Sequence, residues 1–279
     1  MNENLILIEC KDKVGLVAII SELMAKHHLN ITAMREFVDE DNDTFFARIE
    51  CFGSVVSEVK LLNELKEVLP EEAKITINPK KEKKVAVLVT KEYHCLGDIL
   101  IRHSFNTLGA NVCMVAGNYD VLKPFTNRFD VPFFYVSHEG RSKQDFEKDL
   151  VKSIEEFNPD YIVLAKFMRI LSPDFVARFK HKIINIHHSF LPAFIGASPY
   201  RQAHERGVKV IGATAHFVTN DLDEGPIIVQ QTIPVNHTFK VSDMVTAGKE
   251  VEKSVLSKAL QLVFQDRVFI TGNKTIIFE

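Results

Sequence analysis

After residue 84, short apolar segments alternate with helical segments, and this rhythm strongly restricts the folds open to the chain. Residues 85–90 are densely aliphatic, which is typical of a strand covered on both faces of a parallel sheet. Helices are predicted over 141–157 and 242–264. The alternation predicts an α/β fold with a doubly wound, mostly parallel sheet. Further strands are expected at 111–116, 132–136, 160–165, 183–187, 209–218 and 227–234, with a terminal hairpin of 267–270 and 274–278.

The N-terminal residues follow a different order: strand, helix, strand, strand, helix, strand. The third strand alternates strictly, with Phe45, Ala47 and Ile49 on the face opposite to Phe46 and Arg48. This order predicts a ferredoxin-like βαββαβ domain. Its other expected elements are strands 5–10, 31–38 and 73–78 and helices 14–26 and 55–68.

A domain boundary is predicted at residues 79–84, which read Pro-Lys-Lys-Glu-Lys-Lys. We therefore assign residues 1–79 to one domain and residues 84–279 to a second. A solvated loop within a single domain is the alternative, but the change of pattern favours a boundary. The length of 279 residues also suits two domains.

The composition is that of an ordinary globular protein, with 46% apolar residues, 25% charged residues and a formal net charge of -3. No strong field favours nucleic acid or membrane partners. The four cysteines are scattered and form no C-x-x-C pair, so neither a zinc site nor a disulfide framework is expected, and a reduced cytoplasmic setting fits best. The N-terminus has no signal-peptide pattern, and no apolar run reaches the ~18 residues of a membrane span.

Three polar residues in the C-terminal half suggest chemistry at a carbonyl group. Asn185 and His187 are two apart at the carboxyl end of a predicted strand, so they share a face where α/β sheets usually place their sites. Asp223 lies in a Gly/Pro-containing loop after the strand that carries His216. Taken singly, Asn185 fits a turn and Asp223 fits a loop. Together they can stabilise an oxyanion, move a proton and activate water. His188 is expected to point away from His187, so no metal site is predicted.

These residues belong to a longer pattern: Asn-Ile-His-His-Ser-Phe-Leu-Pro at 185–192, His-Phe-Val at 216–218 and Asp-Glu-Gly-Pro at 223–226. It resembles the signature of formyltetrahydrofolate-dependent formyltransferases and hydrolases. The formyltetrahydrofolate deformylase family is the more similar. Residues 91–98 read Lys-Glu-Tyr-His-Cys-Leu-Gly-Asp in place of a phosphate loop, and His188 stands where the transferases typically carry proline. Residues 1–79 resemble an ACT regulatory domain. Ser198 departs from the asparagine expected in the family.

The resemblance implies hydrolysis of 10-formyltetrahydrofolate to tetrahydrofolate and formate, which balances one-carbon pools for purine biosynthesis. No prosthetic group is implied, because the folate is the substrate. Asn185 is expected to donate to the developing oxyanion, and His187 to shuttle the proton that the leaving nitrogen needs. Asp223 either orients His187 or accepts a proton from water. His216 either supports the site or is a core histidine.

The resemblance also implies a folate pocket across the sheet edge. Backbone groups of Arg169 and Leu171 are expected to recognise the pterin ring between apolar side chains. Loop 218–223 is expected to close the opposite side. Without the resemblance, residues 168–171 fit an ordinary strand-to-helix turn equally well. The expected folate-binding residues are Met168, Arg169, Ile170, Leu171, Val218 and Thr219.

Two other functions and one other catalytic mechanism are weighed against this hydrolase interpretation. The first is formyl transfer from the same donor to an amine acceptor. The absence of a phosphate-binding loop argues against a phosphorylated acceptor. The second is a non-catalytic sensor, which the intact Asn185, His187 and Asp223 disfavour. The third is thiolate catalysis by Cys95 beside His94, which would need a lowered thiol pKa. That turn is better interpreted as filling the acceptor site.

In the N-terminal domain, Asp12-Lys13-Val14-Gly15 resembles the Asp-x-x-Gly turn of ACT domains, where helix amides receive the carboxylate of an amino-acid effector. A simple turn and helix start accounts for the same residues. Because ACT domains pair side by side, the resemblance implies a homo-oligomer, either a dimer or a tetramer.

Overall fold

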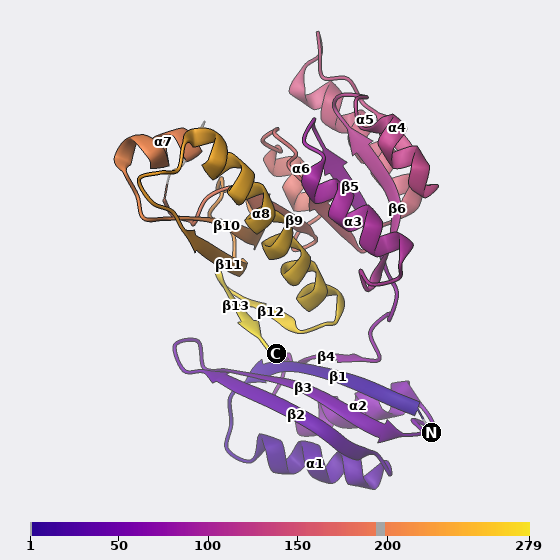
Figure 1. Ribbon diagram of the computed structural model, residues 1–279. Helices are drawn as coiled ribbons and strands as arrows, with labels where there is room; N and C mark the ends of the chain where they lie inside the picture. The colour runs from indigo at the N-terminus through magenta and orange to yellow at the C-terminus, as the bar shows by residue number, and fades with distance from the viewer. Residues whose placement is uncertain (1, 194–198) are drawn as a thin grey trace. The chain divides into compact units, whose positions relative to one another are not determined.

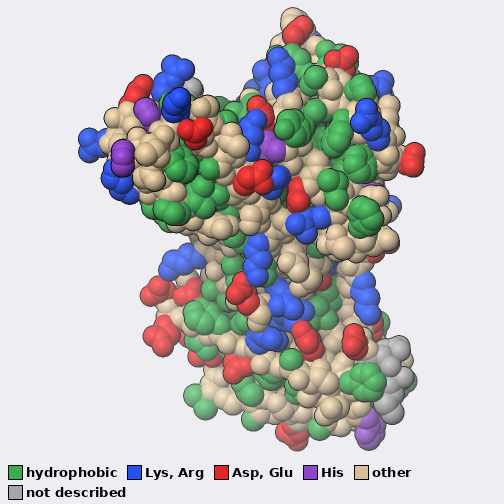
Figure 2. All heavy atoms as spheres, in the orientation of Figure 1, with side chains coloured by type: hydrophobic (Ala, Val, Ile, Leu, Met, Phe, Trp, Pro, Cys, Tyr) green, Lys and Arg blue, Asp and Glu red, His purple; other side chains and the backbone are tan. Residues whose placement is uncertain are grey.

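The computed structural model describes residues 2–193 and 199–279 (Figure 1). The chain divides into two compact units, one of residues 1–81 with 276–279 and one of residues 82–275. Ser198 lies outside the described residues, so its departure from the family pattern has no structural account. No helix within the described ranges is long and apolar enough to cross a membrane. On the face that Figure 2 shows, acidic and basic side chains are interspersed, in keeping with the small net charge.

The N-terminal unit is a four-stranded antiparallel sheet with strand order β2-β3-β1-β4. Its elements are β1 (Asn2–Lys11), α1 (Leu16–Lys26), β2 (Asn30–Asp39), β3 (Thr44–Gly53), α2 (Glu58–Val68) and β4 (Lys74–Ile77). Both helices cover one face, because alternate strand residues such as Ile6, Ile8 and Ile49 pack with Ile20 and Leu61 in one buried cluster. The predicted ferredoxin-like order is confirmed.

Both helices of this unit begin later than predicted, for local reasons. Gly15 has φ +94°, a left-handed conformation that favours glycine and cannot continue into a helix, so α1 begins at Leu16 rather than at residue 14. Helix α2 begins at Glu58 rather than at residue 55. There the hydroxyl of Ser57 accepts a hydrogen bond of 3.2 Å from the backbone N–H of Lys60 and caps the helix.

The C-terminal unit is built on a seven-stranded sheet with strand order β11-β10-β9-β8-β5-β6-β7. Strands β5 to β9 are parallel, whereas β10 runs antiparallel to β9, and β11 antiparallel to β10. The bounds are β5 (Lys83–Val89), β6 (Ala110–Gly117), β7 (Phe133–Tyr135), β8 (Tyr161–Leu164), β9 (Ile183–His187), β10 (Val210–Phe217) and β11 (Ile227–Pro234). The predicted mostly parallel sheet is confirmed.

Helices cover both faces of this sheet, as the alternation in β5 dictates (Figure 1). Val85, Val87 and Val89 pack with α3 (His94–Ser104) and α8 (Val241–Phe264). Ala86 and Leu88 pack with α5 (Lys143–Phe157) and α6 (Pro173–Arg178) on the other face. The remaining elements are α4 (Lys123–Thr126), the 3₁₀ turn η1 (Asn127–Phe129), α7 (Pro199–Arg206) and the two-stranded sheet of β12 (Val268–Thr271) and β13 (Lys274–Ile277).

The burial of Leu88 generates a stability prediction. Its side chain is fully buried in the centre of the sheet, so Leu88→Ala removes packed methyl groups and leaves a cavity. The free energy of unfolding should fall by about 2–5 kcal/mol in urea denaturation. Ile101→Ala, at a helix position that is 51% exposed, is the matched control and should change it by less than about 0.5 kcal/mol. Equal effects would contradict this assignment of the core.

Candidate active site

The reversal of direction between β9 and β10 brings Asn185 and His216 together. The two residues are direct partners in the antiparallel register, so their side chains lie on the same face of the sheet. The amide Nδ2 of Asn185 donates a hydrogen bond of 3.2 Å to Nε2 of His216. The sequence left open whether His216 supports the site or is a core histidine. In the structure it contacts a residue of the site.

The partners of His216 hold its ring in place. Its Nδ1 lies 2.9 Å from the carbonyl oxygen of Phe217 and donates to it. Its Nε2 lies 3.7 Å from Oδ1 of Asp223 and 3.2 Å from the Asn185 amide, and this second contact orients the amide. This is the amide's only hydrogen bond within the described residues, which leaves one N–H of Asn185 for a ligand.

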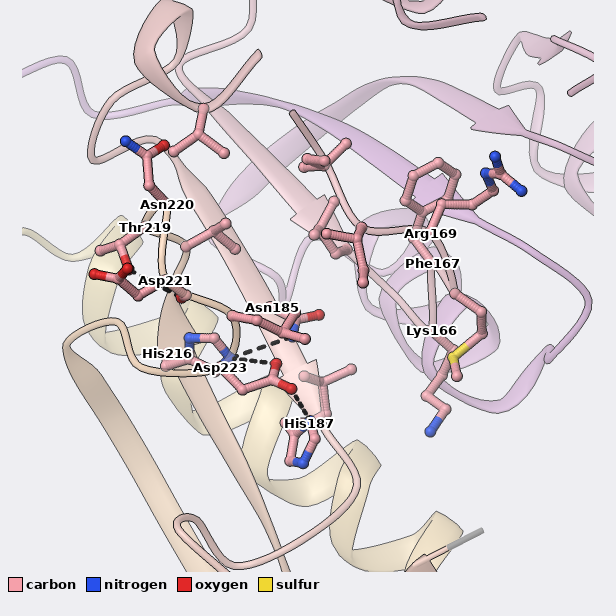
Figure 3. A pocket seen from close by; sticks show the side chains of 18 of the residues that line it. Lys166, Phe167, Arg169, Asn185, His187, His216, Thr219, Asn220, Asp221 and Asp223 are labelled. Atoms are coloured by element: carbon pink, nitrogen blue, oxygen red, sulfur yellow. Dashed lines mark hydrogen bonds and ion pairs between the residues drawn. The ribbon is translucent and has the colours of Figure 1, made fainter. Parts of the chain in front are cut away.

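His187 is held at one nitrogen and free at the other. Its Nδ1 lies 3.2 Å from Oδ2 of Asp223 and donates to that carboxylate. The side chain is buried, and Nε2 has no hydrogen-bond partner among the residues that the structure describes. A buried polar nitrogen without a partner is costly, so it marks a place where a reacting group or water can bind. Figure 3 shows the imidazole beside Asp223 and Asn185.

The loop that carries Asp223 depends on a close approach of two backbone segments. Asp223 has φ +58°, and the Phe217 N–H donates to the Pro226 carbonyl at 2.9 Å where the loop closes. A Cβ atom at Gly225 would lie 1.8 Å from the carbonyl oxygen of Phe217, so only glycine fits there. The Asp-x-Gly-Pro pattern is thus a structural device that brings a carboxylate back over β9 and β10.

Two histidines keep the Asp223 carboxylate ionised. Burial by itself raises the pKa of Asp223, but hydrogen bonding and charge interaction with His187 and His216 outweigh burial and hold the pKa well below its usual value. Oδ1 lies 3.7 Å from Nε2 of His216, so the carboxylate faces both rings. Asp223 is consequently a fixed negative charge beside His187 and a weak proton acceptor.

The site opens into a cavity of about 340 Å³, which is within the usual range for small-molecule sites. Figure 3 shows its two walls: Asn185, His187, His216 and Asp223 on one side, and the segment after β8 on the other. The amide N–H of Met168 donates to Thr90 Oγ1 at 2.9 Å and anchors that segment to the end of β5. All six residues predicted to bind the folate line the cavity, namely Met168, Arg169, Ile170, Leu171, Val218 and Thr219.

The rim of this cavity is apolar and exposed. Met168 is 59% exposed, Ile170 62% and Leu222 55%. These three side chains come from opposite walls of the same cavity. Apolar side chains gathered around an opening are typical of a surface that binds a ligand or a partner.

The expectation that His188 points away from His187 is wrong. His188 lines the same cavity as His187, and the centroids of the two rings lie 5.1 Å apart. The reason is that β9 ends at His187. His188 lies outside the strand, so its side chain does not follow the alternation of faces within the strand.

A second charged cluster lies behind the cavity and was not predicted. Glu252 on α8 is 1% exposed, and its carboxylate accepts from His94 Nε2 at 2.7 Å and from the Tyr200 hydroxyl at 2.8 Å. Lys166, which lines the cavity, places Nζ 3.2 Å from the same carboxylate. Burial raises the pKa of Glu252, but His94, Lys166 and Tyr200 outweigh it and lower the pKa overall. A charged residue within the buried stripe of α8 was the signal that sequence analysis could have used.

His94, Cys95 and Glu252 also place possible metal-ligand atoms within 4.8 Å of one another. The ammonium group of Lys166 already neutralises the Glu252 carboxylate and would repel a cation there. Burial and the nearby Glu252 raise the pKa of the Cys95 thiol, so this cysteine has the opposite of the shift that thiolate catalysis needs. The cluster is best explained as a buried ion-pair network.

Comparisons with known proteins identify the family of the chain. Residues 83–260 match the formyl transferase family model, and residues 4–69 match the ACT domain model. The chain is 49% identical to a formyltetrahydrofolate deformylase of Haemophilus influenzae, covering 99% of each chain, and 52% identical to one of Escherichia coli O6:H1, covering 96% of this chain and 95% of the other. The chain belongs to the formyltetrahydrofolate deformylase family. A crystal structure of the family, from Pseudomonas syringae pv. tomato, superposes with a TM-score of 0.94 at 35% identity, covering 99% of this chain and 94% of that one.

The close approach at Gly225 generates a prediction about the Asp223 loop. Gly225→Ala should force the loop away from Phe217 and lower the free energy of unfolding by about 1–3 kcal/mol, the usual cost of overpacking. Gly97→Ala on α3 is the control, because a Cβ there meets its nearest neighbour at an ordinary 3.6 Å. Urea denaturation of both variants is the measurement, and a Gly225→Ala variant as stable as the control would contradict the account.

The lowered pKa of Asp223 generates a prediction about pH. Asp223 binds its proton less readily in the folded state, so its contribution to stability is complete above the unfolded pKa of about 3.9 and is lost as the pH falls further. Wild type should therefore be more stable than Asp223→Asn at pH 7. The difference should begin to shrink below about pH 4. Urea denaturation from pH 7 downward measures it, and a difference independent of pH would refute the ion pair.

Proposed function

We propose that this chain hydrolyses 10-formyltetrahydrofolate to tetrahydrofolate and formate, with Asn185, His187 and Asp223 as its catalytic residues. The observation that carries the proposal is the unpartnered, buried Nε2 of His187 beside the free N–H of Asn185 in the cavity. Membership of the deformylase family supports the reaction, since the relatives' names state it. The folate is the substrate, and no prosthetic group takes part in the proposed steps.

The proposed reaction has two steps. In the first, the oxygen of a water molecule forms a bond to the formyl carbon, and His187 Nε2 takes one water proton. The π pair of the carbonyl moves onto its oxygen, where the Asn185 N–H donates to it. In the second, that pair reforms the carbonyl, the bond from carbon to N10 breaks, and His187 returns the proton to N10. Formic acid then ionises, so the products are tetrahydrofolate, formate and one proton.

Asp223 acts through His187 in this scheme. A carboxylate whose pKa is lowered is a poor base for water, but it stabilises the imidazolium that forms in the first step. The contact of Asp223 Oδ2 with Nδ1 also fixes the orientation of the His187 ring, which lines the cavity. Of the two roles that the sequence left open, orientation of His187 is therefore the one we propose.

The folate is proposed to bind between segments 168–171 and 218–223. Within the described residues, the backbone N–H groups of Arg169 and Leu171 have no hydrogen-bond partner, so they are available to the pterin ring. Met168 and Ile170 supply apolar contact area at the rim, and Val218 and Thr219 line the opposite wall. Arg169 lies over the ring of Phe146, with Cζ 5.5 Å from its centroid, which keeps this segment against the sheet.

We further propose that residues 1–79 form a regulatory domain and residues 84–279 the catalytic domain. Gly15, at the N-terminus of α1, has the left-handed conformation that allows a ligand to approach the helix amides, which supports a small amino-acid effector. Strand β2 is an edge of its sheet and carries Phe37, which is 45% exposed, so it supports pairing into a dimer or tetramer. The four free cysteines support a cytoplasmic setting. The proposed cellular role is the balance of one-carbon units for purine biosynthesis.

Removal of the proposed catalytic groups tests the function. Asn185→Ala and Asp223→Asn should each lower kcat for 10-formyltetrahydrofolate by about 10²–10³-fold, because each weakens stabilisation of the transition state. Thr238→Ala, at an exposed position outside the cavity, is the control and should leave kcat unchanged. Formate release and thermal unfolding are measured for all three variants.

The same assay separates hydrolysis from transfer. Wild type should release formate over many turnovers without any added amine. Formate or formyl product that forms only when an amine is supplied would favour the runner-up function, formyl transfer to an amine acceptor. Full activity of both catalytic variants would remove Asn185 and Asp223 from the mechanism.

A further inference from the structure

His188 is a polar residue of the cavity for which the proposed steps have no use. Its ring lies 5.1 Å from the ring of His187 and 6.3 Å from that of Tyr200, centroid to centroid. The side chain is half-buried and lines the cavity. Within the described part of the chain, neither ring nitrogen has a hydrogen-bond partner, although the neighbouring His187 is held by Asp223. An imidazole with free nitrogens, next to a proposed proton acceptor, is suited to hold a small polar molecule.

The surroundings of His188 keep this ring uncharged at neutral pH. Burial, and then the positive charges of Lys166 and His187, lower the pKa of His188 to about 4. Glu252 and Asp223 act in the opposite direction and do not compensate. A neutral imidazole carries one nitrogen that accepts a hydrogen bond and one that donates. His188 therefore offers an acceptor to the cavity throughout the range in which the enzyme is expected to work.

The wall behind His188 is fixed by the Glu252 network. Tyr200 reaches Glu252 only because residue 248 is glycine: a Cβ there would lie 2.0 Å from the Tyr200 hydroxyl. Lys166 is tied to the same carboxylate at 3.2 Å, so its ammonium group is held at a set position on the cavity wall. His188 thus lies near the rings of both Tyr200 and His187.

We propose that a ring nitrogen of His188 holds the water that attacks the formyl carbon. The inference rests on the proposed hydrolysis. A water molecule that donates to two acceptors joins atoms about 4–5 Å apart. Two imidazole rings whose centroids lie 5.1 Å apart can present nitrogens at that separation. With one hydrogen directed at His187 Nε2 and the other at His188, the water keeps a lone pair for the carbonyl carbon.

The proton count of the reaction is unchanged by this residue. His187 takes the first water proton and later delivers it to N10. The second hydrogen donates to His188 during attack but stays on the former water oxygen, and it leaves when formic acid ionises. His188 therefore gains no proton, and its contribution is to fix the direction of attack.

A pair of substitutions distinguishes this role from simple packing. His188→Phe keeps a planar ring against Tyr200 but removes the acceptor, whereas His188→Asn keeps an acceptor and loses most of the packing. Holding of water predicts that kcat falls about tenfold or more in His188→Phe, the loss expected from one hydrogen bond, and that His188→Asn retains more activity. KM should change by less than about threefold in both, because the folate contacts other residues. A purely structural role predicts the opposite order of the two variants.

Controls keep the outcome interpretable. Tetrahydrofolate binding and thermal unfolding are measured for each variant, and His188→Leu with His188→Gln repeats the contrast if the phenylalanine variant fails to fold. A His188→Phe variant with wild-type kcat, or one more active than His188→Asn, would overturn the inference while leaving the hydrolysis intact. Absence of formate release by wild type would instead refute the proposed function itself.

Discussion

The pairing of β9 with the reversed strand β10 is the constraint from which the site follows. In a wholly parallel sheet, side chains at the carboxyl end of one strand meet only those at the carboxyl ends of its neighbours. Here β10 runs the other way, so His216, near its own carboxyl end, lies opposite Asn185. The carbonyl of Phe217 then holds the His216 ring, and the ring in turn contacts the amide of Asn185. The orientation of the Asn185 amide is thus a consequence of sheet register.

The Asp223 loop completes the same arrangement at a local cost to the backbone. A non-glycine residue with positive φ and a glycine without room for Cβ stand two positions apart in it. Such departures from ordinary backbone geometry persist where surrounding contacts determine them, and they gather at functional sites. Here the contacts are the two histidines that face the carboxylate. The loop thereby holds the Asp223 carboxylate beside His187.

Local and periodic features were predictable from the sequence, and contacts between distant segments were not. The aliphatic run in β5 correctly indicated helices on both faces, and the two-residue spacing of Asn185 and His187 correctly placed them on one face of β9. The expected direction of the His188 side chain was wrong because hydrophobic periodicity does not show at which residue a strand ends. Glu252 was missed because its partners His94, Lys166 and Tyr200 lie at least 52 residues away along the chain. No spacing rule relates such residues before the fold is known.

The carboxylates of Glu252 and Asp223 divide the polar groups in and around the cavity into two sets. The Glu252 carboxylate has three donors within the protein and does not line the cavity. Its charge therefore holds Lys166 and Tyr200 in place. Asp223 is shared by two imidazoles, one of which has a buried nitrogen without a hydrogen-bond partner among the described residues. His187 and His188 stand between these sets, adjacent in sequence but held by different neighbours. One is held by the Asp223 carboxylate, and the surroundings of the other lower its pKa to about 4. Two residues of one type thereby acquire different environments, on which their proposed roles depend.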